Sequence, residues 1–261
     1  ASRLRHLRAG ESLDMALIDI DGLKSVNDSL GVEQGDRLLA RFAQRLTSYM
    51  AGSVVGRLGG DEFLVVLPGL NGPDASCQVA ERILKTFAPP FMLSGQEVFV
   101  TTSIGIATFP DDSDNSGTLL QHADAAMYEA KHKGKSAYAR FTPEMSEVSH
   151  ERLQMESHMR KALELGEFEL YFQPIVDTAS GGLVAAEALL RWNNPAMGMV
   201  MPDRFIPLAE ETGLIIRLGE LALRQACIQV QALERAGFES LKMAVNFSVR
   251  QLTDSGFPDL M

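Results

Sequence analysis

The first 140 residues alternate between short apolar runs and amphipathic segments of helical period. The apolar runs, which predict strands, lie at residues 13–20, 53–58, 63–67, 98–109 and 136–141. Segments with apolar side chains at helical spacing, which predict helices, lie at residues 35–50, 73–87 and 118–133. The resulting order is roughly β-α-β-β-α-β-α-β, which predicts an α/β sandwich with an antiparallel element.

The rest of the chain begins with a polar stretch and then returns to regular periodicity. Residues 142–150 are polar and lack strong periodicity, and we interpret 143–150 as a linker that leads into a helix. Two strands follow, then a loop rich in Asn, Pro, Gly and Met, two helices and a further strand. These strands are predicted at residues 169–176, 182–192 and 241–247. We therefore expect two domains, residues 1–142 and 151–261.

Composition fits globular domains and limits the classes of partner. Of 261 residues, 46% are hydrophobic and 22% are charged, which is enough apolar material for a core. The formal net charge of −10 disfavours nucleic acid and anionic membranes, because both bind basic surfaces. No apolar run reaches membrane-spanning length, so we expect a cytoplasmic chain without a membrane segment. A longer parent protein could still be tethered to a membrane through segments outside this chain.

The two cysteines, Cys77 and Cys227, stand in helical patterns far from other Cys or His residues at ligand spacing. We expect buried, reduced thiols at both positions and neither a disulfide nor a zinc site.

The strongest candidate for chemistry is the predicted turn Gly59-Gly60-Asp61-Glu62-Phe63 between two apolar runs. The two glycines allow positive φ and close approach of the backbone. The turn presents two adjacent carboxylates at the tip of a hairpin, where turn geometry does not require acids. Their position therefore favours a functional role.

A second pair of acids, Asp19 and Asp21, ends the first predicted strand. Carboxylates at a strand end are poorly placed for core packing and well placed for Mg²⁺, which prefers oxygen ligands and keeps phosphates as partners. Asp19 and the hairpin acids Asp61 and Glu62 could hold such ions together. Two ions can activate an attacking hydroxyl and stabilise the leaving oxygen. Asp21 is also compatible with an ordinary turn or capping role.

These motifs together resemble the GGDEF family of diguanylate cyclases over roughly the first 140 residues. Residues 19–28 with Gly31, Gly35 and Asp36 resemble the family's second block, and residues 130–135 resemble its closing motif. The resemblance implies a palm-like cyclase fold and the condensation of two GTP to cyclic di-GMP with release of pyrophosphate. Because each cyclase domain holds one GTP, it also implies at least a transient homodimer.

By position, the resemblance assigns roles around a bound GTP with Mg²⁺ or Mn²⁺ as cofactor. The implied metal ligands are Asp19, the Ile20 carbonyl, Asp61 and Glu62, and the implied catalytic residues are Asp61 and Glu62. Which of these two acids deprotonates the 3′-hydroxyl stays open. The implied GTP contacts are Lys24, Asn27, Asp36, Gly60, Lys131 and Lys135. Singly, each of these residues has an ordinary explanation as a loop residue, a solvated lysine or a helix-end cation. Their joint spacing favours the site.

Five positions depart from the family pattern. Leu23 replaces the usual Phe, Val32 the usual His, and Lys135 the usual Arg, which removes a bidentate phosphate contact but keeps the charge. The family's product-feedback site, an Arg and an Asp, maps to Met50 and Ser53. Because neither side chain can bind a phosphate or guanine in that way, we predict no inhibitory site there.

A second set of blocks centres on residues 187–192, Glu-Ala-Leu-Leu-Arg-Trp. Together with residues 171–176, 202–210 and 245–248, it resembles the first part of an EAL-family cyclic di-GMP phosphodiesterase, whose fold is a TIM-like barrel. The resemblance implies that Glu187 and Asn246 are metal ligands. It also implies that Gln173 and Arg191 contact cyclic di-GMP. An ordinary strand-end ion pair between Arg191 and Glu187 is the alternative.

From residue 151 the chain has too few residues for a closed barrel of ~250 residues. We therefore expect only the N-terminal portion of the barrel, with about three strands and no hydrolytic activity of its own.

The sequence thus predicts a bacterial signalling protein of cyclic di-GMP turnover whose first domain is a diguanylate cyclase. One alternative is a GTP-binding regulatory GGDEF domain that controls an EAL phosphodiesterase, which would hydrolyse cyclic di-GMP to pGpG. A non-enzymatic cyclic di-GMP receptor is disfavoured, because both halves keep their acids.

Overall fold

The structure, a computed structural model, describes residues 12–70, 74–238, 241–253 and 256. The chain divides into two compact units, Ala1–Ser149 and His150–Met261. Both units combine helices with strands, so the predicted α/β class is confirmed. None of the helices in the described ranges combines the length and the apolar composition that a membrane crossing requires.

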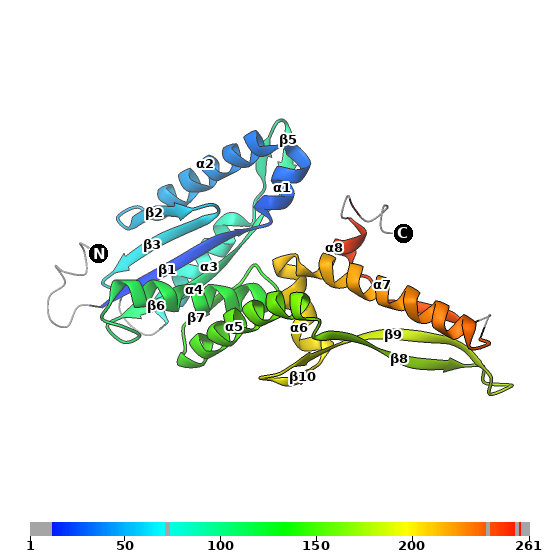
Figure 1. The fold of residues 1–261 in the computed structure, drawn as a ribbon. Coiled ribbons are helices and arrows are strands. Elements are labelled where there is room, and N and C mark those ends of the chain that lie inside the picture. The colour runs from blue at the N-terminus through cyan, green and yellow to red at the C-terminus, as the bar shows by residue number, and fades with distance from the viewer. Residues whose placement is uncertain (1–11, 71–73, 239–240, 254–255, 257–261) are drawn as a thin grey trace. The chain divides into compact units, whose positions relative to one another are not determined.

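The first unit is built on a five-stranded sheet in the order β2-β3-β1-β6-β7 (Figure 1). Its central strand β1 (Leu13–Asp21) runs antiparallel to both β3 (Glu62–Pro68) and β6 (Thr101–Phe109). At the edges, β2 (Val54–Gly59) is antiparallel to β3, and β7 (Tyr138–Arg140) is parallel to β6. The β2–β3 pair is the hairpin that the sequence predicts.

Helices cover both faces of this sheet. They are α1 (Leu23–Leu30), α2 (Val32–Tyr49), α3 (Ala75–Phe87) and α4 (Ser116–His132). Alternate residues of β1 point to opposite faces, as expected for a strand. Ile18 and Ile20 pack in one core cluster with residues of α2 and α3, while Met15 and Leu17 pack in another with residues of α4.

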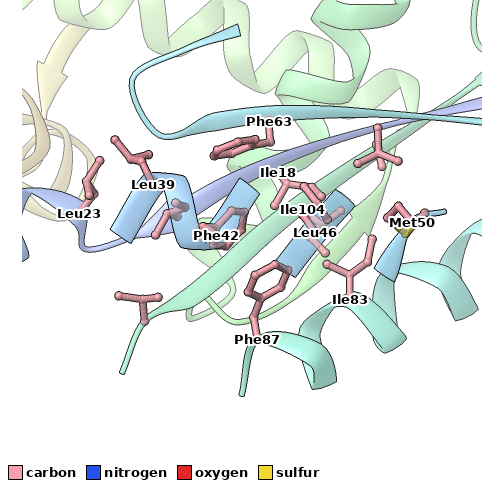
Figure 2. Packing of buried hydrophobic residues seen from close by; sticks show 14 of the residues in the cluster. Ile18, Leu23, Leu39, Phe42, Leu46, Met50, Phe63, Ile83, Phe87 and Ile104 are labelled. Carbon is pink, nitrogen blue, oxygen red and sulfur yellow. The ribbon is translucent and has the colours of Figure 1, made fainter. Parts of the chain in front are cut away.

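Aromatic side chains fill the core between α2, α3 and the sheet (Figure 2). The ring of Phe42 stacks on that of Phe87 at a centroid distance of 4.0 Å and lies 5.0 Å from the ring of Phe63. All three side chains are at most 2% exposed. This packing fixes α2 against β3, the strand that begins with Glu62.

The structure contains short elements in the first unit that the sequence analysis does not predict. Helix α1 has only eight residues and lies between Gly22 and Gly31, both with positive φ. Its Asn, Asp and Ser content is typical of turns, which masks the helical pattern. Only residues 101–109 of the predicted strand 98–109 form β6 in the main sheet. Val98 instead ends β5 (Gln96–Val98), which pairs with β4 (Phe91–Leu93) in a separate hairpin. The predicted helix start at Pro73 lies outside the described residues.

The second unit has an open sheet covered by helices. Its elements are α5 (Pro143–Leu165) from His150 onward, β8 (Phe168–Val176), β9 (Leu183–Asn194), β10 (Gly198–Val200), α6 (Pro202–Thr212), α7 (Leu214–Arg235), β11 (Lys242–Val245) and α8 (Val249–Leu252). Strand β9 pairs antiparallel with β8 and β10 and parallel with β11. Within its described part, the sheet has four strands, one more than the three predicted, because the short β10 lies in a segment predicted as a loop.

An aromatic cluster anchors β9 to the helices of this unit. Trp192 is fully buried, with its ring centroid 5.4 Å from that of Phe168 and 6.0 Å from that of Phe205 on α6. The indole Nε1 donates a hydrogen bond to Glu167 at 2.9 Å. The only tryptophan of the chain therefore ties the two long strands to α6.

Two expectations differ from the structure. The segment 143–150, predicted as a linker, is helical and forms the first turns of α5, which Pro143 can begin because a first-turn residue needs no N–H partner. The two units divide inside this segment.

The two cysteines differ in burial. Cys77 is partly buried, whereas Cys227 is exposed on α7, so the prediction of a buried thiol at Cys227 is wrong. Helical periodicity alone did not reveal that Cys227 lies on the outward stripe of α7.

Candidate functional site

Strand pairing gathers the predicted acids of the first unit at one end of its sheet. In the antiparallel register of β1 and β3, Asp19 lies directly opposite Glu62. The backbone N–H of Ile20 donates to the carbonyl oxygen of Asp61 at 3.3 Å. The four residues that the sequence analysis assigns to the metal, from two segments about 40 residues apart, are thus brought together.

Lys131 on α4 reaches this acidic cluster. Its Nζ lies 2.8 Å from Oδ2 of Asp19, whose side chain is only 8% exposed. Burial raises the pKa of Asp19 to about 6, while the hydrogen bond and positive charge of Lys131 lower it and the charges of Asp61 and Asp21 raise it further. The single cation therefore compensates only part of the cost of burying this carboxylate.

Glu62 is held in a similar electrostatic environment. Burial is the largest cause that raises the pKa of Glu62, followed by the negative charge of Asp124 on α4, and Asp61 adds to it while Lys131 opposes it. Asp124 is absent from the sequence-based site. It lies two helical turns before Lys131, on the same face of α4, and this spacing could have revealed it.

The donor set fits a bound divalent cation. Among the described residues, no three Asp, Glu, His or Cys side chains converge into a ready-made metal cluster. Mg²⁺ binds through one or two carboxylates and takes its other ligands from phosphates and waters, so Asp19, a hairpin acid and the Ile20 carbonyl are a sufficient protein contribution. A cation there would also offset the burial and the mutual repulsion that raise the pKa values of Asp19 and Glu62.

Asp21 has a structural role at the end of β1. Its carboxylate accepts hydrogen bonds from Thr101 Oγ1 at 2.7 Å, from Ser103 Oγ at 2.9 Å and from the backbone N–H of Ser136 at 3.3 Å. The last bond holds the turn that contains Lys135, whose φ of 62° lies in the left-handed region. Asp21 therefore helps to place Lys135, in agreement with the turn-related role left open by the sequence.

The hairpin turn carries its own clamp. Gly60 has a φ of 52°, and its carbonyl oxygen accepts hydrogen bonds from Arg57 Nε at 2.9 Å and Nη2 at 2.6 Å. Arg57 is a further contributor that the sequence analysis did not assign. Its position three residues before Gly60, on the strand that leads into the turn, is the available signal.

The residues assigned to the guanine base lie where α1 and α2 meet. Asn27 is on α1, and Asp36 is exposed on the second turn of α2. Asp36 lines a cavity of about 350 Å³ between α2 and β2, together with Arg57 and small side chains such as Ala40. Lys24 lies exposed on α1, and neither it nor Lys135 forms an ion pair with any described residue.

Met50 and Ser53 lie in the turn between α2 and β2. Met50 is 7% exposed and belongs to the core, and its carbonyl oxygen accepts a hydrogen bond from the Ser53 N–H at 2.9 Å. A buried thioether at this position offers no group for a phosphate. The absence of an inhibitory site stays a prediction.

The second unit also brings its predicted residues together. Glu187 pairs in register with Gln173 on β8 and with Ala244 on β11. Asn246, just beyond β11, donates from Nδ2 to Oε1 of Glu187 at 2.7 Å. Arg191 lies farther along β9, with its guanidinium 5.8 Å from the ring centre of Tyr171. Within the described chain, it forms no ion pair with Glu187.

Helix α8 begins three residues after Asn246 and is anchored to α7. Ser248 and Gln251 form a capping box, and the Gln251 side chain lies against Gly219 of α7, where an added β-carbon would meet Nε2 at 1.6 Å. The sequence analysis did not select Gln251, although the Ser-x-x-Gln spacing is the signal for a capping box.

Comparison with protein families gives two matches. Residues 1–137 match the family described as diguanylate cyclase, GGDEF domain, and residues 156–261 match the EAL domain family.

Curated proteins align with almost the whole chain. It is 38% identical to the bifunctional diguanylate cyclase/cyclic di-GMP phosphodiesterase MucR of Pseudomonas aeruginosa, over 97% of this chain and 37% of MucR. It is 39% identical to the cyclic di-GMP phosphodiesterase PdeR of Escherichia coli, over 91% of this chain and 36% of PdeR. The chain therefore spans about a third of the length of these relatives.

Solved structures match the first unit. The GGDEF domain of YfiN (TpbB) from Pseudomonas aeruginosa is 35% identical, with a TM-score of 0.52, and the match covers 54% of this chain and 89% of that domain. An EAL/GGDEF domain protein from M. capsulatus is 39% identical, with a TM-score of 0.50, over 54% of this chain and 94% of that one.

Proposed function

The chain belongs to the GGDEF family, with an EAL domain following the GGDEF domain, and we propose that its first domain condenses two GTP into cyclic di-GMP. Both families support a role in cyclic di-GMP turnover signalling. The observation that carries the proposal is the acidic cluster, in which Asp19 faces Glu62 across two paired strands and contacts Lys131. This arrangement suits a metal-bound triphosphate better than it suits a folding role, because buried like charges are costly without a counterion.

In this proposal, Asp19, the Ile20 carbonyl and the hairpin acids hold Mg²⁺ or Mn²⁺. When bound, the metal would stabilise negative charge on the phosphates and make the 3′-hydroxyl more acidic. Lys131, 2.8 Å from Asp19, lies within reach of the same phosphates, and Lys24 and Lys135 would add positive charge around the phosphate tail.

Glu62 is the better candidate for proton acceptor. Strand register places Glu62 directly opposite Asp19, next to the proposed metal that would acidify the 3′-hydroxyl. The 3′-oxygen of one GTP attacks the α-phosphorus of the other and loses its proton to Glu62. The bond from that phosphorus to the β-phosphate bridge breaks, and pyrophosphate leaves. A second, symmetrical step closes the ring, which requires two domains face to face.

Asn27 and Asp36 would select the base. A carboxylate accepts hydrogen bonds from the guanine N1–H and exocyclic amine, and an amide can complement a neighbouring acceptor. The two residues lie on adjacent helices joined at Gly31, whose N–H donates to the Asn27 carbonyl at 2.9 Å.

For the second domain, we propose that Glu187 and Asn246 contribute to a metal site and that Gln173 and Arg191 contact cyclic di-GMP. The 2.7 Å hydrogen bond between Asn246 and Glu187 and the pairing of Gln173 with Glu187 support this grouping.

A second candidate function is regulatory. In it, the GGDEF domain binds GTP without much turnover and controls the EAL phosphodiesterase, which hydrolyses cyclic di-GMP to pGpG. Two observations favour it: relatives such as PdeR are named only as phosphodiesterases, and Val32, in place of the usual His, is 67% exposed beside the base site.

Product analysis separates the two functions. Purified chain is incubated with Mg²⁺ and GTP, and the products are identified by mass spectrometry, with Glu62→Gln and Asp28→Asn as the test and control variants. Cyclic di-GMP made by the wild type and by Asp28→Asn, and lost in Glu62→Gln, supports the cyclase. GTP binding without product supports the regulatory function, and absence of GTP binding contradicts both.

A further inference from the structure

The contact between α1 and α2 depends on the lack of a side chain at Gly35. A β-carbon placed on Gly35 would lie 1.7 Å from Oδ1 of Asn27, 2.9 Å from its Cγ and 3.5 Å from its Nδ2. The amide oxygen of Asn27 thus occupies the space that any other residue at position 35 would fill. The amide nitrogen is the part of the group farthest from that point.

The backbone of Gly35 does not itself require glycine. Gly35 is buried inside α2 and does not have the positive φ at which glycine is favoured over other residues. Glycine inside a helix is less favourable than alanine, so its presence here has a cost to the helix. The close approach of Asn27 is the feature that accounts for it.

The orientation of the Asn27 amide is defined by this contact. Its Oδ1 is buried and has no hydrogen-bond partner among the described residues. An α-carbon hydrogen of glycine can make a weak contact to an oxygen, whereas the reverse orientation would set the amide N–H₂ against C–H groups. The oxygen therefore faces α2, and the N–H₂ group is turned away from Gly35.

We propose that Gly35 is a positioning residue that fixes the Asn27 amide with its donor end toward the nucleotide base, which rests on the proposed GTP binding. An N–H₂ donor pairs with an acceptor of guanine, while the carboxylate of Asp36, the next residue, accepts from the guanine N1–H and amine. Adenine lacks the N1–H and the 2-amine, so the fixed pair selects guanine over adenine.

Gly35→Ala tests this role without breaking the fold. The atom that the new methyl group meets is the far end of a flexible side chain, so Asn27 rotates away and the helix persists. Asn27→Ala removes that atom. A cycle of the wild type, both single variants and the double variant then isolates the contact.

Melting temperatures of these four proteins need no ligand. In the Asn27→Ala background, Gly35→Ala raises the melting temperature, because alanine favours the helix and nothing obstructs its methyl group. With Asn27 present, that gain is lost or reversed. An equal shift in both backgrounds overturns the proposed contact.

Nucleotide binding tests the selectivity, measured by titration calorimetry with Mg²⁺–GTP and Mg²⁺–ATP. We expect Gly35→Ala to weaken GTP binding about tenfold, to lower the ratio of GTP to ATP affinity, and to add nothing further in the Asn27→Ala background. The control Gly117→Ala, on α4 with only a 3.2 Å contact to Asn115, keeps wild-type binding.

The outcomes separate this inference from the proposed function. Wild-type selectivity in Gly35→Ala overturns the positioning role while GTP binding stands. If the wild type binds no GTP, the proposed function and the guanine role fail together, and the melting cycle still decides whether Gly35 orients Asn27.

Discussion

At the scale of single residues, the candidate site is a cluster of acids that Lys131 contacts through Asp19. Asp19, Asp61, Glu62 and Asp124 influence one another's environment, and Lys131 is the cation whose contact with them is defined, at 2.8 Å from Asp19. The burial of Asp19 could not be predicted from its neighbours in sequence, because it arises from β3, β6 and α4 closing around the end of β1.

Lys131→Met should destabilise the fold and weaken GTP binding. The variant keeps the length of the side chain but leaves the Asp19 carboxylate without its partner, so we expect the free energy of unfolding to fall by roughly 1–3 kcal/mol. Lys131 is itself 33% exposed, which places the effect toward the lower value. Urea unfolding and calorimetric titration with Mg²⁺–GTP measure the two effects.

Lys133→Met is the matched control on the same helix. Lys133 pairs with Glu129 at 3.4 Å and is 62% exposed, so its ion pair should contribute less than about 1 kcal/mol. Equal effects of the two substitutions on GTP binding would contradict the role assigned to Lys131.

Asp14 should make stability depend on pH. It is 6% exposed, and burial raises its pKa above the ordinary 3.8, although Thr108 donates a hydrogen bond to it and Arg140 lies near. Because the folded protein binds this proton more tightly, the stabilising contribution is present below pH 3.8 and is lost as pH rises through the raised pKa. In Asp14→Asn, stability should therefore fall less between about pH 4 and pH 7. Urea unfolding across this range measures it, and identical pH profiles would contradict it.

At the scale of elements, the long periodic segments could be predicted and the short ones could not. Strand β1 follows from its unbroken apolar run, because it is buried on both faces, and helices α2 and α4 follow from apolar spacing, because each buries one continuous face. Helix α1 and strands β4 and β10 have too few residues to show a clear apolar period. Their structure depends on the elements that they pack against or pair with. Motif spacing predicted the other site residues, whereas Asp124 and Arg57 lie outside the motifs and follow only once α4 and the hairpin are considered as elements.

Helix α2 carries both Asp36 of the proposed base site and the core residue Phe42, and replacing Phe42 tests how the helix is packed. Phe42 is fully buried between Phe87 and Phe63, so Phe42→Ala should cost about 3–5 kcal/mol in the free energy of unfolding (Figure 2). Tyr49, the last residue of the same helix, is 39% exposed, so Tyr49→Ala should change the free energy of unfolding by less than about 1 kcal/mol. Chemical denaturation of both variants is the measurement. A cost for Phe42→Ala no larger than for Tyr49→Ala would contradict the packing.

At the scale of the whole molecule, each of the two units gathers the residues that the proposed function assigns to one reaction of cyclic di-GMP turnover. In the first, β1–β3 pairing joins the acids, and in the second, β9 joins Glu187 to Gln173 and Asn246. Two-unit organisation was visible in the sequence as a polar stretch between periodic segments. The helical state of that stretch was not, because its polar residues show no clear apolar face.

The proposed cyclase reaction needs two copies of the chain. In the proposed function, each first unit contributes one Asn27 and one Asp36 to read a base and therefore accommodates one GTP. The rate of cyclic di-GMP formation per mole of protein should therefore rise with protein concentration until the dimer is saturated. Initial rates over a dilution series measure this. A specific rate independent of concentration, in a chain that sedimentation shows to be monomeric throughout, would contradict it.

Binding of Mn²⁺ in the presence of GTP tests most directly whether the Asp19–Glu62 cluster is the metal–nucleotide site. Electron paramagnetic resonance of Mn²⁺ titrated into the chain with GTP distinguishes bound from free metal. We predict that the wild type and the exposed-acid control Asp28→Asn bind Mn²⁺–GTP alike, and that Asp19→Asn loses at least tenfold in affinity, about 1.4 kcal/mol. Undiminished binding by a folded Asp19→Asn variant would contradict the account.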